Sequence, residues 1–319
     1  MEKISKVERK GFSKVEYVKD ELKVAYLILA HTDAKHLEKL THTISYKARI
    51  FIHLDKKVGM SKDFSDIVLP QSAEFIKERV KVYWGGVSMI RATVNLIEAA
   101  LASGESFSHL VLLSGLDYPI KPPQEIYTFL TSQPSRQFIR FIDLADSPVP
   151  ETGRLSRYWF MEPIFPFFDD TLIRRVLRKL FESDRLQRKL NEDRKLAFGS
   201  QWWVITPECA TYILEFVKNN PYLWNLYKYS HAPDEHFFHT IVANSPYIEQ
   251  AGGFSVGIKW PHHLSNLHIG YLNKLYCEEN FEYLKESDKF FARKFTSNKS
   301  SKLINLIDAH FNSCASSTL

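Results

Sequence analysis

Two neighbouring carboxylates in the second half of the chain have the residue types and the position of a general base. Asp234 and Glu235 follow Pro233, which favours the first turn of a helix, and a histidine lies on each side of the segment. Acids at this position either interact with the positive end of the helix or accept a proton from a substrate. Adjacent side chains on a helix diverge by about 100°, so the two do not form the facing carboxylate pair of a retaining glycosidase. The pattern leaves a helix-capping acid and a single general base as the two interpretations.

A pair of cations near the C-terminus is the second candidate for chemistry. Arg293 and Lys294 lie among Phe290, Phe291 and Phe295. Fixed guanidinium and ammonium groups could bind a diphosphate and stabilise its charge. The same pattern is also typical of an amphipathic strand whose lysine reaches solvent between apolar neighbours. Both interpretations remain open at this point.

Several motifs of other chemistries are absent from the sequence. It contains no D-x-D, the usual means by which a nucleotide-sugar enzyme holds a divalent metal on a diphosphate, and no His/Asp/Glu cluster with metal-ligand spacing. It also lacks G-x-S-x-G, C-x-x-C, G-x-G-x-x-G and G-x-x-x-x-G-K-[ST]. The sequence therefore predicts no metal and no cofactor, and it disfavours a hydrolase triad, a redox dithiol, a dinucleotide fold and a P-loop.

The composition indicates an ordinary globular protein. Hydrophobic residues make up 45% and charged residues 25% of the 319 positions, which excludes a disordered or fibrous chain. The net charge of +5 is too thinly spread to favour nucleic acid, although it suits an anionic ligand or an acidic lipid surface. Three cysteines, all far apart, favour a reducing compartment. The N-terminal residues have no apolar core of a signal peptide, and no apolar run approaches the ~18 residues that span a bilayer, so we expect a cytoplasmic protein.

The first half of the chain alternates strand and helix patterns. The strands are short, continuous and β-branched, as is typical of strands covered on both faces. The predicted elements are strands at 24–30, 49–55, 80–84 and 109–114, a helix capped by Asp33, and a helix from Ser88 to Ala102 capped by Ser88. This order predicts an α/β fold with a mostly parallel, doubly wound, Rossmann-like sheet.

Polar residues follow three of these strands. His31, Asp55 and Asp117 come directly after, or within a few residues of, the strand ends. In doubly wound sheets ligands bind beyond the carboxyl ends of the strands. We therefore expect these three side chains to lie together at the ligand-binding edge.

The second half of the chain begins with a segment of different character. Residues 142–198 mix proline, aromatic and basic residues and include a predicted cationic helix over about 171–194. A solvated basic face is the ordinary interpretation, and contact with anionic lipid is the alternative. The basic residues concerned are Arg174, Arg175, Arg178, Lys179, Arg185, Arg188 and Lys189. A strand at 199–206, a helix at 207–218 and a helix opening within 231–238 follow.

Four sequence blocks, in order, carry a resemblance to a known family. They are LVLLSGLDYPIKPPQEI (110–126), GSQWWVITPECATYIL (199–214), APDEHFFHTI (232–241) and FFARKF (290–295). The set resembles the core-2/I-branching N-acetylglucosaminyltransferase family, which also includes the peptide O-xylosyltransferases. The likeness spans roughly residues 24 to 296.

The resemblance implies a GT-A-type glycosyltransferase fold and a division of the chain. Residues 1–22 are then an N-terminal polar extension and 23–296 the transferase domain, with a donor half over about 23–142 and an acceptor half over about 143–296. Residues 297–319 are expected to be a polar C-terminal tail. Animal members carry disulfide cysteines and an N-terminal membrane anchor, and the absence of both features here predicts a bacterial cytoplasmic relative.

The resemblance also implies an activity, the inverting and metal-independent transfer of a sugar from a UDP-sugar to a hydroxyl of a glycan or lipid-linked oligosaccharide. The glutamate of the P-D-E block is the catalytic base of the family, which corresponds to Glu235. The lysine of the F-A-x-K-F block contacts the donor diphosphate, which corresponds to Lys294. Asp55 corresponds to the uridine site, and Asp117 opens the turn beside the donor sugar.

Further site residues follow from the same resemblance. His31, Trp260 and Arg293 are expected on the donor side, and Tyr118, Trp202 and Asp234 in the donor-sugar or acceptor pocket. Between positions 261 and 279, where relatives carry a second diphosphate-binding arginine, this chain offers only His268 and Lys274. Arg293 could substitute for that arginine.

Two other functions remain open. One is a non-catalytic carbohydrate-binding protein on the same fold. The other is a metal-dependent transferase in which Asp55, within His53-Leu54-Asp55, serves as a degenerate metal motif. N-acetylglucosamine and xylose are the expected donor sugars, and nucleic acid is not an expected partner.

Overall fold

A mainly parallel sheet forms the centre of the computed structural model, which describes residues 21–59, 61–146, 152–165, 170–181, 188, 194–255, 266–270 and 274–316. The five strands run in the order β3-β2-β1-β4-β8. All neighbouring pairs are parallel except β4 and β8, which are antiparallel. The strands are β1 (Lys23–Ala30), β2 (Ala48–Leu54), β3 (Ala73–Phe75), β4 (Phe107–Ser114) and β8 (Val204–Ile205). The α/β fold class predicted from the sequence is confirmed.

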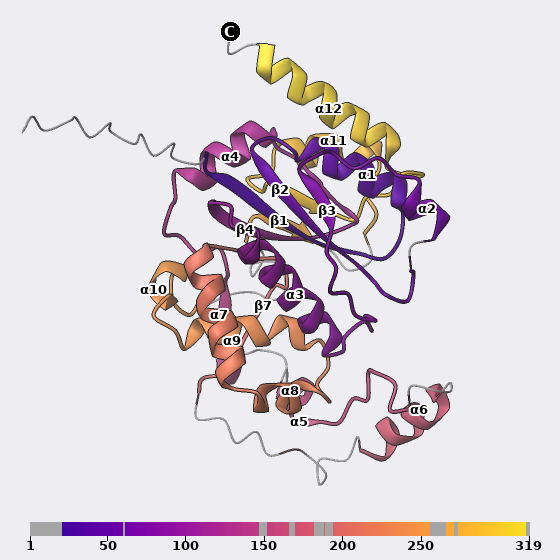
Figure 1. The fold of residues 1–319 in the computed structure, drawn as a ribbon, viewed down its shortest axis with the longest axis vertical. Coiled ribbons are helices and arrows are strands. Elements are labelled where there is room, and N and C mark those ends of the chain that lie inside the picture. Colours follow the sequence, from indigo (N-terminus) through magenta and orange to yellow (C-terminus); the bar gives the residue numbers. More distant parts are fainter. Residues whose placement is uncertain are drawn as a thin grey trace, which may run out of the picture.

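Helices cover both faces of this sheet, which explains its continuous apolar strands (Figure 1). All eight residues of β4 are buried. Side chains alternate along β1, so that Leu27 packs with α3 (Ser88–Ala102) and α7 (Pro207–Asn219) on one face. Ile28 packs on the other face with α1 (Ala34–Thr43), α4 (Pro123–Thr131) and α12 (Ser301–Ser316). The sheet thus presents only its edges and strand ends to ligands.

Two small sheets lie beside the central one. The first has the order β5-β10-β9, and the second pairs β6 with β7. The register of the first sheet places Arg293 opposite Asp117 and Phe291 opposite His268. Their strands are β5 (Asp117–Pro119), β9 (His268–Gly270), β10 (Phe291–Arg293), β6 (Phe141–Asp143) and β7 (Ala197–Gly199). The first small sheet therefore gathers residues that are far apart in the chain.

Short helices complete the described structure. They lie mostly between β6 and β10. They are α2 (Lys62–Ser65), η1 (Leu144–Asp146), α5 (Thr152–Ser156), α6 (Thr171–Leu180), α8 (Tyr222–Tyr227), η3 (Pro233–Glu235), α9 (Phe237–Ala243), α10 (Ile248–Ala251), η5 (Glu278–Asn280) and α11 (Phe281–Lys285). No helix within the described ranges is both long enough and apolar enough to cross a bilayer.

The strand predicted at 80–84 is wrong, because this segment is a loop tied to the end of β2. Its backbone is bonded to residues of that strand end: Val80 N–H donates to His53 Nε2 at 3.0 Å, and Val82 N–H donates to Asp55 Oδ1 at 3.1 Å. The third parallel strand is β3, at 73–75. The backbone of this segment is thus hydrogen-bonded to two buried polar side chains, and not to a neighbouring strand as the apolar pattern predicted.

The predicted caps of the first two helices have different outcomes. Asp33 does cap α1, since its Oδ1 accepts a hydrogen bond from His36 N–H at 3.1 Å. Ser88 does not cap α3, whose N-cap position is Val87 without a side-chain bond. Instead, Ser88 Oγ accepts from Tyr83 N–H at 2.9 Å and holds the preceding loop.

Two predicted boundaries in the second half differ from the structure. The strand predicted at 199–206 is split between β7 and β8, which belong to different sheets, because the chain leaves β6 after Gly199 and reaches β4 at Val204. The predicted tail at 297–319 contains helix α12, in which Leu303, Ile304 and Ile307 are buried against the main core. Its i, i+1, i+4 apolar spacing explains why this polar-looking segment packs.

Candidate active site

Asp55 lies at the carboxyl edge of the central sheet and is engaged with the backbone around it. Its N–H donates to the carbonyl of Ala30 at 2.9 Å, which joins the ends of β2 and β1. Its buried Oδ1 accepts from the N–H groups of Lys57 and Val82 at 2.9 and 3.1 Å. The Lys57 ammonium lies 3.5 Å from Oδ2. Asp55 therefore shapes the loop that borders the edge.

His31 lies at the same edge, directly after β1, with an exposed side chain. Although part of the ring reaches solvent, desolvation by the atoms around it and the positive charges of Arg293, Lys57 and Lys294 lower the pKa of His31, while the charge of Asp55 raises it. A neutral imidazole can both donate and accept a hydrogen bond. His31 is consequently suited to contact an uncharged polar group next to the cations.

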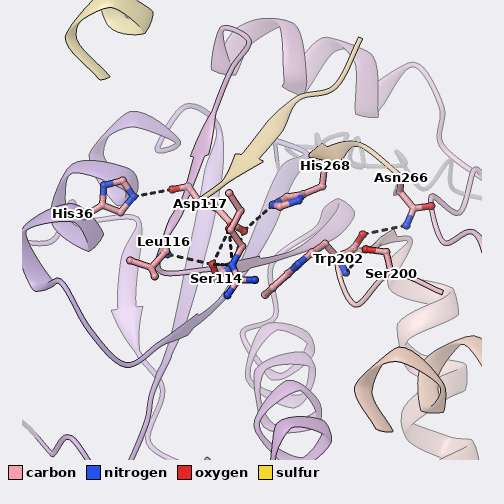
Figure 2. A network of polar contacts seen from close by, with 9 residues as sticks. His36, Ser114, Leu116, Asp117, Ser200, Trp202, Asn266 and His268 are labelled. Atoms are coloured by element: carbon pink, nitrogen blue, oxygen red, sulfur yellow. Dashed lines mark hydrogen bonds and ion pairs between the residues drawn. The ribbon is translucent and has the colours of Figure 1, made fainter. Parts of the chain in front are cut away.

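Asp117 lies at the centre of a buried polar network, shown in Figure 2. Its Oδ2 accepts from Ser114 N–H at 2.7 Å, and Oδ1 accepts from Ser114 Oγ at 2.7 Å. His268 Nε2 lies 3.1 Å from Oδ2, and His36 Nε2 lies 3.0 Å from the Asp117 carbonyl oxygen. These contacts fix the turn after β4 to the small β5-β10-β9 sheet.

Arg293 is fixed against this network. Its Nε donates to Ser114 Oγ at 2.9 Å and lies 3.6 Å from Asp117 Oδ1. The guanidinium carbon lies 4.9 Å from the ring centroid of Trp202, which itself stacks on His268 at 5.6 Å. Burial lowers the pKa of Arg293, and the carboxylates of Asp117 and Asp234 oppose this effect. Arg293 is thus a positioned cation beside an aromatic ring.

Lys294 follows Arg293 at the end of β10. Its backbone N–H donates to the Lys274 carbonyl at 3.1 Å, and its own carbonyl accepts from Tyr276 N–H at 3.0 Å. Burial and the charge of Arg293 lower the pKa of its ammonium. Within the described ranges, no hydrogen bond or ion pair involves the Lys294 ammonium. Two adjacent cations, one of which has no anionic partner in the described part of the chain, make a site suited to a polyanion.

Glu235 ends the 3-10 helix η3 and forms an ion pair with Arg154. The Arg154 Nη1 to Glu235 Oε2 distance is 2.6 Å, and the Glu235 side chain is 33% exposed. The segment before it is held by a glycine loop, since Ala232 N–H donates to the Gly85 carbonyl at 2.9 Å. Gly85 has a φ of 72°, a conformation that favours glycine. The carboxylate is therefore positioned by two distant segments and remains accessible.

The second glycine of that loop, Gly86, leaves room for the Glu162 side chain. A Cβ on Gly86 would lie 2.6 Å from Glu162 Oε1. That carboxylate accepts from Ser88 N–H at 2.5 Å, at the start of α3. Glu162 thus joins the loop before α3 to the segment before α6.

Asp234, in contrast to Glu235, is buried. Its Oδ1 has no hydrogen-bond partner among the described residues, and η3 has no side-chain cap. Of the two interpretations of this acidic pair, the helix-capping acid is therefore wrong for Asp234. Burial and the charge of Glu235 raise the pKa of Asp234 to about 7, while Arg154 and Arg293 oppose this shift. The charges of Glu235, Arg154 and Arg293 therefore all act on the Asp234 carboxyl.

We expect Asp234→Asn to change the pH dependence of stability. The unfolded chain ionises this carboxyl near pH 4, whereas the folded chain retains the proton to about pH 7. The wild-type free energy of unfolding should fall over this window by at most about 1.4 kcal/mol per pH unit for this one proton. The variant lacks this loss, so its stability relative to wild type should increase from pH 4 to pH 7 in denaturant titrations.

A control at an exposed acid separates this effect from a general charge effect. Asp288 is 84% exposed and pairs with Lys289, so Asp288→Asn should leave the pH profile near that of wild type. A stability difference between Asp234→Asn and wild type that is constant from pH 4 to pH 7 would contradict the buried, protonated carboxyl.

Two expected pocket residues, Trp202 and Tyr118, and one expected donor-side residue, Trp260, have different outcomes. Trp202 joins the site through Arg293 and His268. Tyr118 does not, because its hydroxyl donates to Asp308 Oδ1 at 2.7 Å and lies 3.0 Å from Thr43 Oγ1, within the core between α1 and α12. Its expected role in a sugar pocket is therefore replaced by a structural one. Trp260 lies outside the described residues.

Several site residues were not found from the sequence. Arg154 and Glu162 make the contacts described above but belong to no motif that indicates a role, and Ser114 lies in the block at 110–126 without having been singled out. His268 and Lys274 were considered as cations for a diphosphate. His268 contacts Asp117 instead, and the backbone carbonyl of Lys274 holds Lys294.

The described residues offer no preformed metal centre. Among them, no group of three or more His, Cys, Asp or Glu side chains is arranged to hold a metal ion. The Asp55 carboxylate is already bonded to two backbone N–H groups and faces an ammonium. This arrangement disfavours Asp55 as a metal ligand.

The fold and the site together define a class of protein. A mainly parallel α/β sheet with a bonded aspartate at its carboxyl edge, beside a small sheet that carries a positioned arginine, agrees with a GT-A-like glycosyltransferase fold. The chain belongs to the Core-2/I-Branching enzyme family, whose sequence model matches residues 24–253. The resemblance found in the four sequence blocks is thereby confirmed.

Named relatives support this membership. Xylosyltransferase 2 of Canis lupus familiaris is 23% identical over 315 residues, covering 91% of this chain and 34% of the relative. Xylosyltransferase 2 of Rattus norvegicus is 24% identical over 310 residues, with the same coverage. The N-acetyllactosaminide beta-1,6-N-acetylglucosaminyl-transferase of Homo sapiens is 23% identical over 294 residues, covering 86% of this chain and 68% of the relative. The chain spans about a third of the length of these xylosyltransferases.

Proposed function

We propose that this protein is an inverting, metal-independent glycosyltransferase. It transfers a sugar, N-acetylglucosamine or xylose, from a UDP-sugar to a hydroxyl of a glycan or lipid-linked oligosaccharide. The observation that carries the proposal is the adjacent pair Arg293 and Lys294, with the Arg293 side chain held by Ser114 and Asp117, together with the accessible Glu235 carboxylate held by Arg154. The family membership and the names of the relatives support the same class of reaction.

The cations act on the leaving group. As the bond between the anomeric carbon and the diphosphate oxygen breaks, its electron pair moves to UDP, and negative charge grows on the diphosphate. The Arg293 side chain is held by Ser114, and the backbone of Lys294 is held by Lys274 and Tyr276, so both cations start from anchored positions next to the growing charge. The charges of Arg293, Lys294 and Asp55 all act on His31, and the uracil and ribose would bind next to His31 and Asp55.

The carboxylate acts on the acceptor. Glu235 accepts the proton of the attacking hydroxyl while the hydroxyl oxygen bonds to the anomeric carbon from the face opposite UDP. Arg154 holds Oε2 at 2.6 Å and so sets the direction of the carboxylate. One base and fixed cations suffice for a single displacement, which inverts the anomeric configuration.

A donor-hydrolysis screen tests this proposal without a known acceptor. Purified protein is incubated with UDP-N-acetylglucosamine, UDP-xylose and other UDP-sugars, and released UDP is measured with and without excess EDTA. We expect slow release from one donor that EDTA does not abolish. Release that requires added metal would favour the Asp55-metal alternative.

The carbohydrate-binding alternative makes a different prediction in the same screen. A non-catalytic protein would bind a glycan but release no UDP from any donor, even with a mixture of glycan acceptors.

We further propose a cytoplasmic location at the inner face of a membrane, where a lipid-linked acceptor would be available.

A further inference from the structure

Helix α6 has an apolar face that the rest of the described structure leaves uncovered. None of its residues is buried, and Leu172, Val176 and Leu180 are 72%, 57% and 61% exposed. Their four-residue spacing places them on one side of the helix. Ile173, 41% exposed, widens the same face. A contiguous exposed apolar face of this kind marks an interaction site.

The other side of the same helix is basic. Arg174, Arg175, Arg178 and Lys179 lie opposite the apolar face, and the sequence from Thr171 to Leu180 contains no acid. Helical geometry places Lys179 at a border of the apolar face, next to Leu172. A basic side chain at such a border extends along the apolar surface and presents its charge to headgroups.

The helix is held in a fixed position at the periphery of the molecule (Figure 1). Arg174 Nε lies 2.7 Å from Oδ1 of the buried Asp170, and Arg174 Nη1 donates to the Met161 carbonyl at 3.1 Å. Asp170 Oδ2 accepts from the N–H groups of Ile164 and Phe165 at 2.5 and 3.1 Å. The N-terminal end is therefore anchored while both faces remain available.

We infer that α6 docks in the plane of a membrane surface that contains anionic lipid. A helix with a basic polar face, an apolar face and low net hydrophobicity is suited to the boundary between headgroups and acyl chains. An anionic lipid surface would bind both the apolar face and the basic side of α6. An apolar groove on a second copy of the chain would bind only the apolar face. Docking does not depend on the proposed transfer reaction and can be measured without any sugar donor.

Vesicle binding by the full chain tests this inference. Sedimentation is measured with vesicles of phosphatidylcholine alone and of phosphatidylcholine mixed with phosphatidylglycerol, at low and high salt. We expect stronger binding to the anionic vesicles, weakened by salt. Leu172→Asp with Val176→Asp should abolish it, while Leu306→Asp, at a 43% exposed position of α12, should not.

Charge variants give a quantitative arm. Each basic residue near an anionic surface strengthens binding by about fivefold, so Arg175→Gln with Lys179→Gln should weaken it about 25-fold. Exposed lysines on other helices serve as the matched control, through Lys218→Gln with Lys302→Gln. Equal loss in both double variants would show a general charge effect and would overturn docking through α6.

A fluorescent probe tests the orientation of the helix. An environment-sensitive dye is attached at Val176→Cys or at Arg175→Cys, with Cys277 and Cys314 replaced by serine and Cys209 retained because it is buried. Anionic vesicles should shift the emission to shorter wavelength at position 176 and not at position 175.

Three results would each overturn the inference. The first is equal partitioning of the protein onto neutral and anionic vesicles, and the second is unchanged vesicle binding by the α6 variants. The third is a dimer of the protein that Val176→Asp dissociates.

Discussion

We expect Glu235→Gln to lower the turnover of the UDP-sugar substrate by about 10²–10⁴-fold, with UDP affinity near that of wild type. Glutamine retains the shape and the hydrogen-bonding capacity of the side chain but cannot accept the acceptor proton at neutral pH. The Glu235 side chain contacts Arg154 and is accessible, so the substitution removes no buried packing. Initial rates at saturating donor, together with calorimetric UDP titration, measure both quantities.

A matched acid elsewhere controls for the position of Glu235 at a helix start. Glu208 also follows a proline in the first turn of a helix, α7, and is exposed. Glu208→Gln should leave turnover unchanged. Wild-type turnover in a folded Glu235→Gln protein would show that Glu235 is not the base, even if the protein is a transferase.

The second large effect is expected for Lys294→Ala. If its ammonium stabilises the leaving diphosphate, the variant should lose about 10²–10³-fold in kcat/KM and less in UDP affinity, because the interaction strengthens as the bond breaks. Since its backbone makes the contacts with Lys274 and Tyr276, removal of the side chain should preserve the end of β10. Steady-state kinetics and UDP titrations, each with and without EDTA, give the comparison.

Lys289 provides the control for a general loss of positive charge. It precedes the same strand, its side chain is 25% exposed, and it pairs with Asp288. Lys289→Ala should leave kcat/KM and UDP affinity unchanged. If Lys294→Ala binds UDP as tightly as wild type and keeps its kcat/KM, Lys294 is a lysine that only reaches solvent between phenylalanines. UDP binding that disappears with EDTA would contradict the metal-independent site.

Much of the central fold could be predicted from local patterns. The buried runs of β1, β2 and β4 and the helical periodicity of α1 and α7 are strong signals, because both faces of a parallel sheet are covered. The pattern failed where a tertiary contact decided the outcome. Residues 80–84 are as apolar as a strand, yet their backbone is bonded to His53 and Asp55.

The position of site residues at the sheet edge was also predictable in part. His31 and Asp55 follow β1 and β2, and parallel strands bring their carboxyl ends to one edge. The contacts of Asp117 were not predictable, because His268 reaches it through the pairing of β5, β10 and β9. The same holds for Arg154, which meets Glu235 from a segment without any motif.

The sequence by itself determined the elements whose signals are local and the family, whose four blocks keep their order along the chain. Only the tertiary structure decided that Asp234 is buried and Glu235 accessible, and that Tyr118 supports the core. Asp234 and Glu235 are adjacent acids in one motif, so the local sequence does not distinguish them. Their burial and ion pairing, and the burial of Tyr118, depend on distant segments such as α12 and the loop of Gly85. The chemistry of this site is therefore set by long-range packing, which no local pattern encodes.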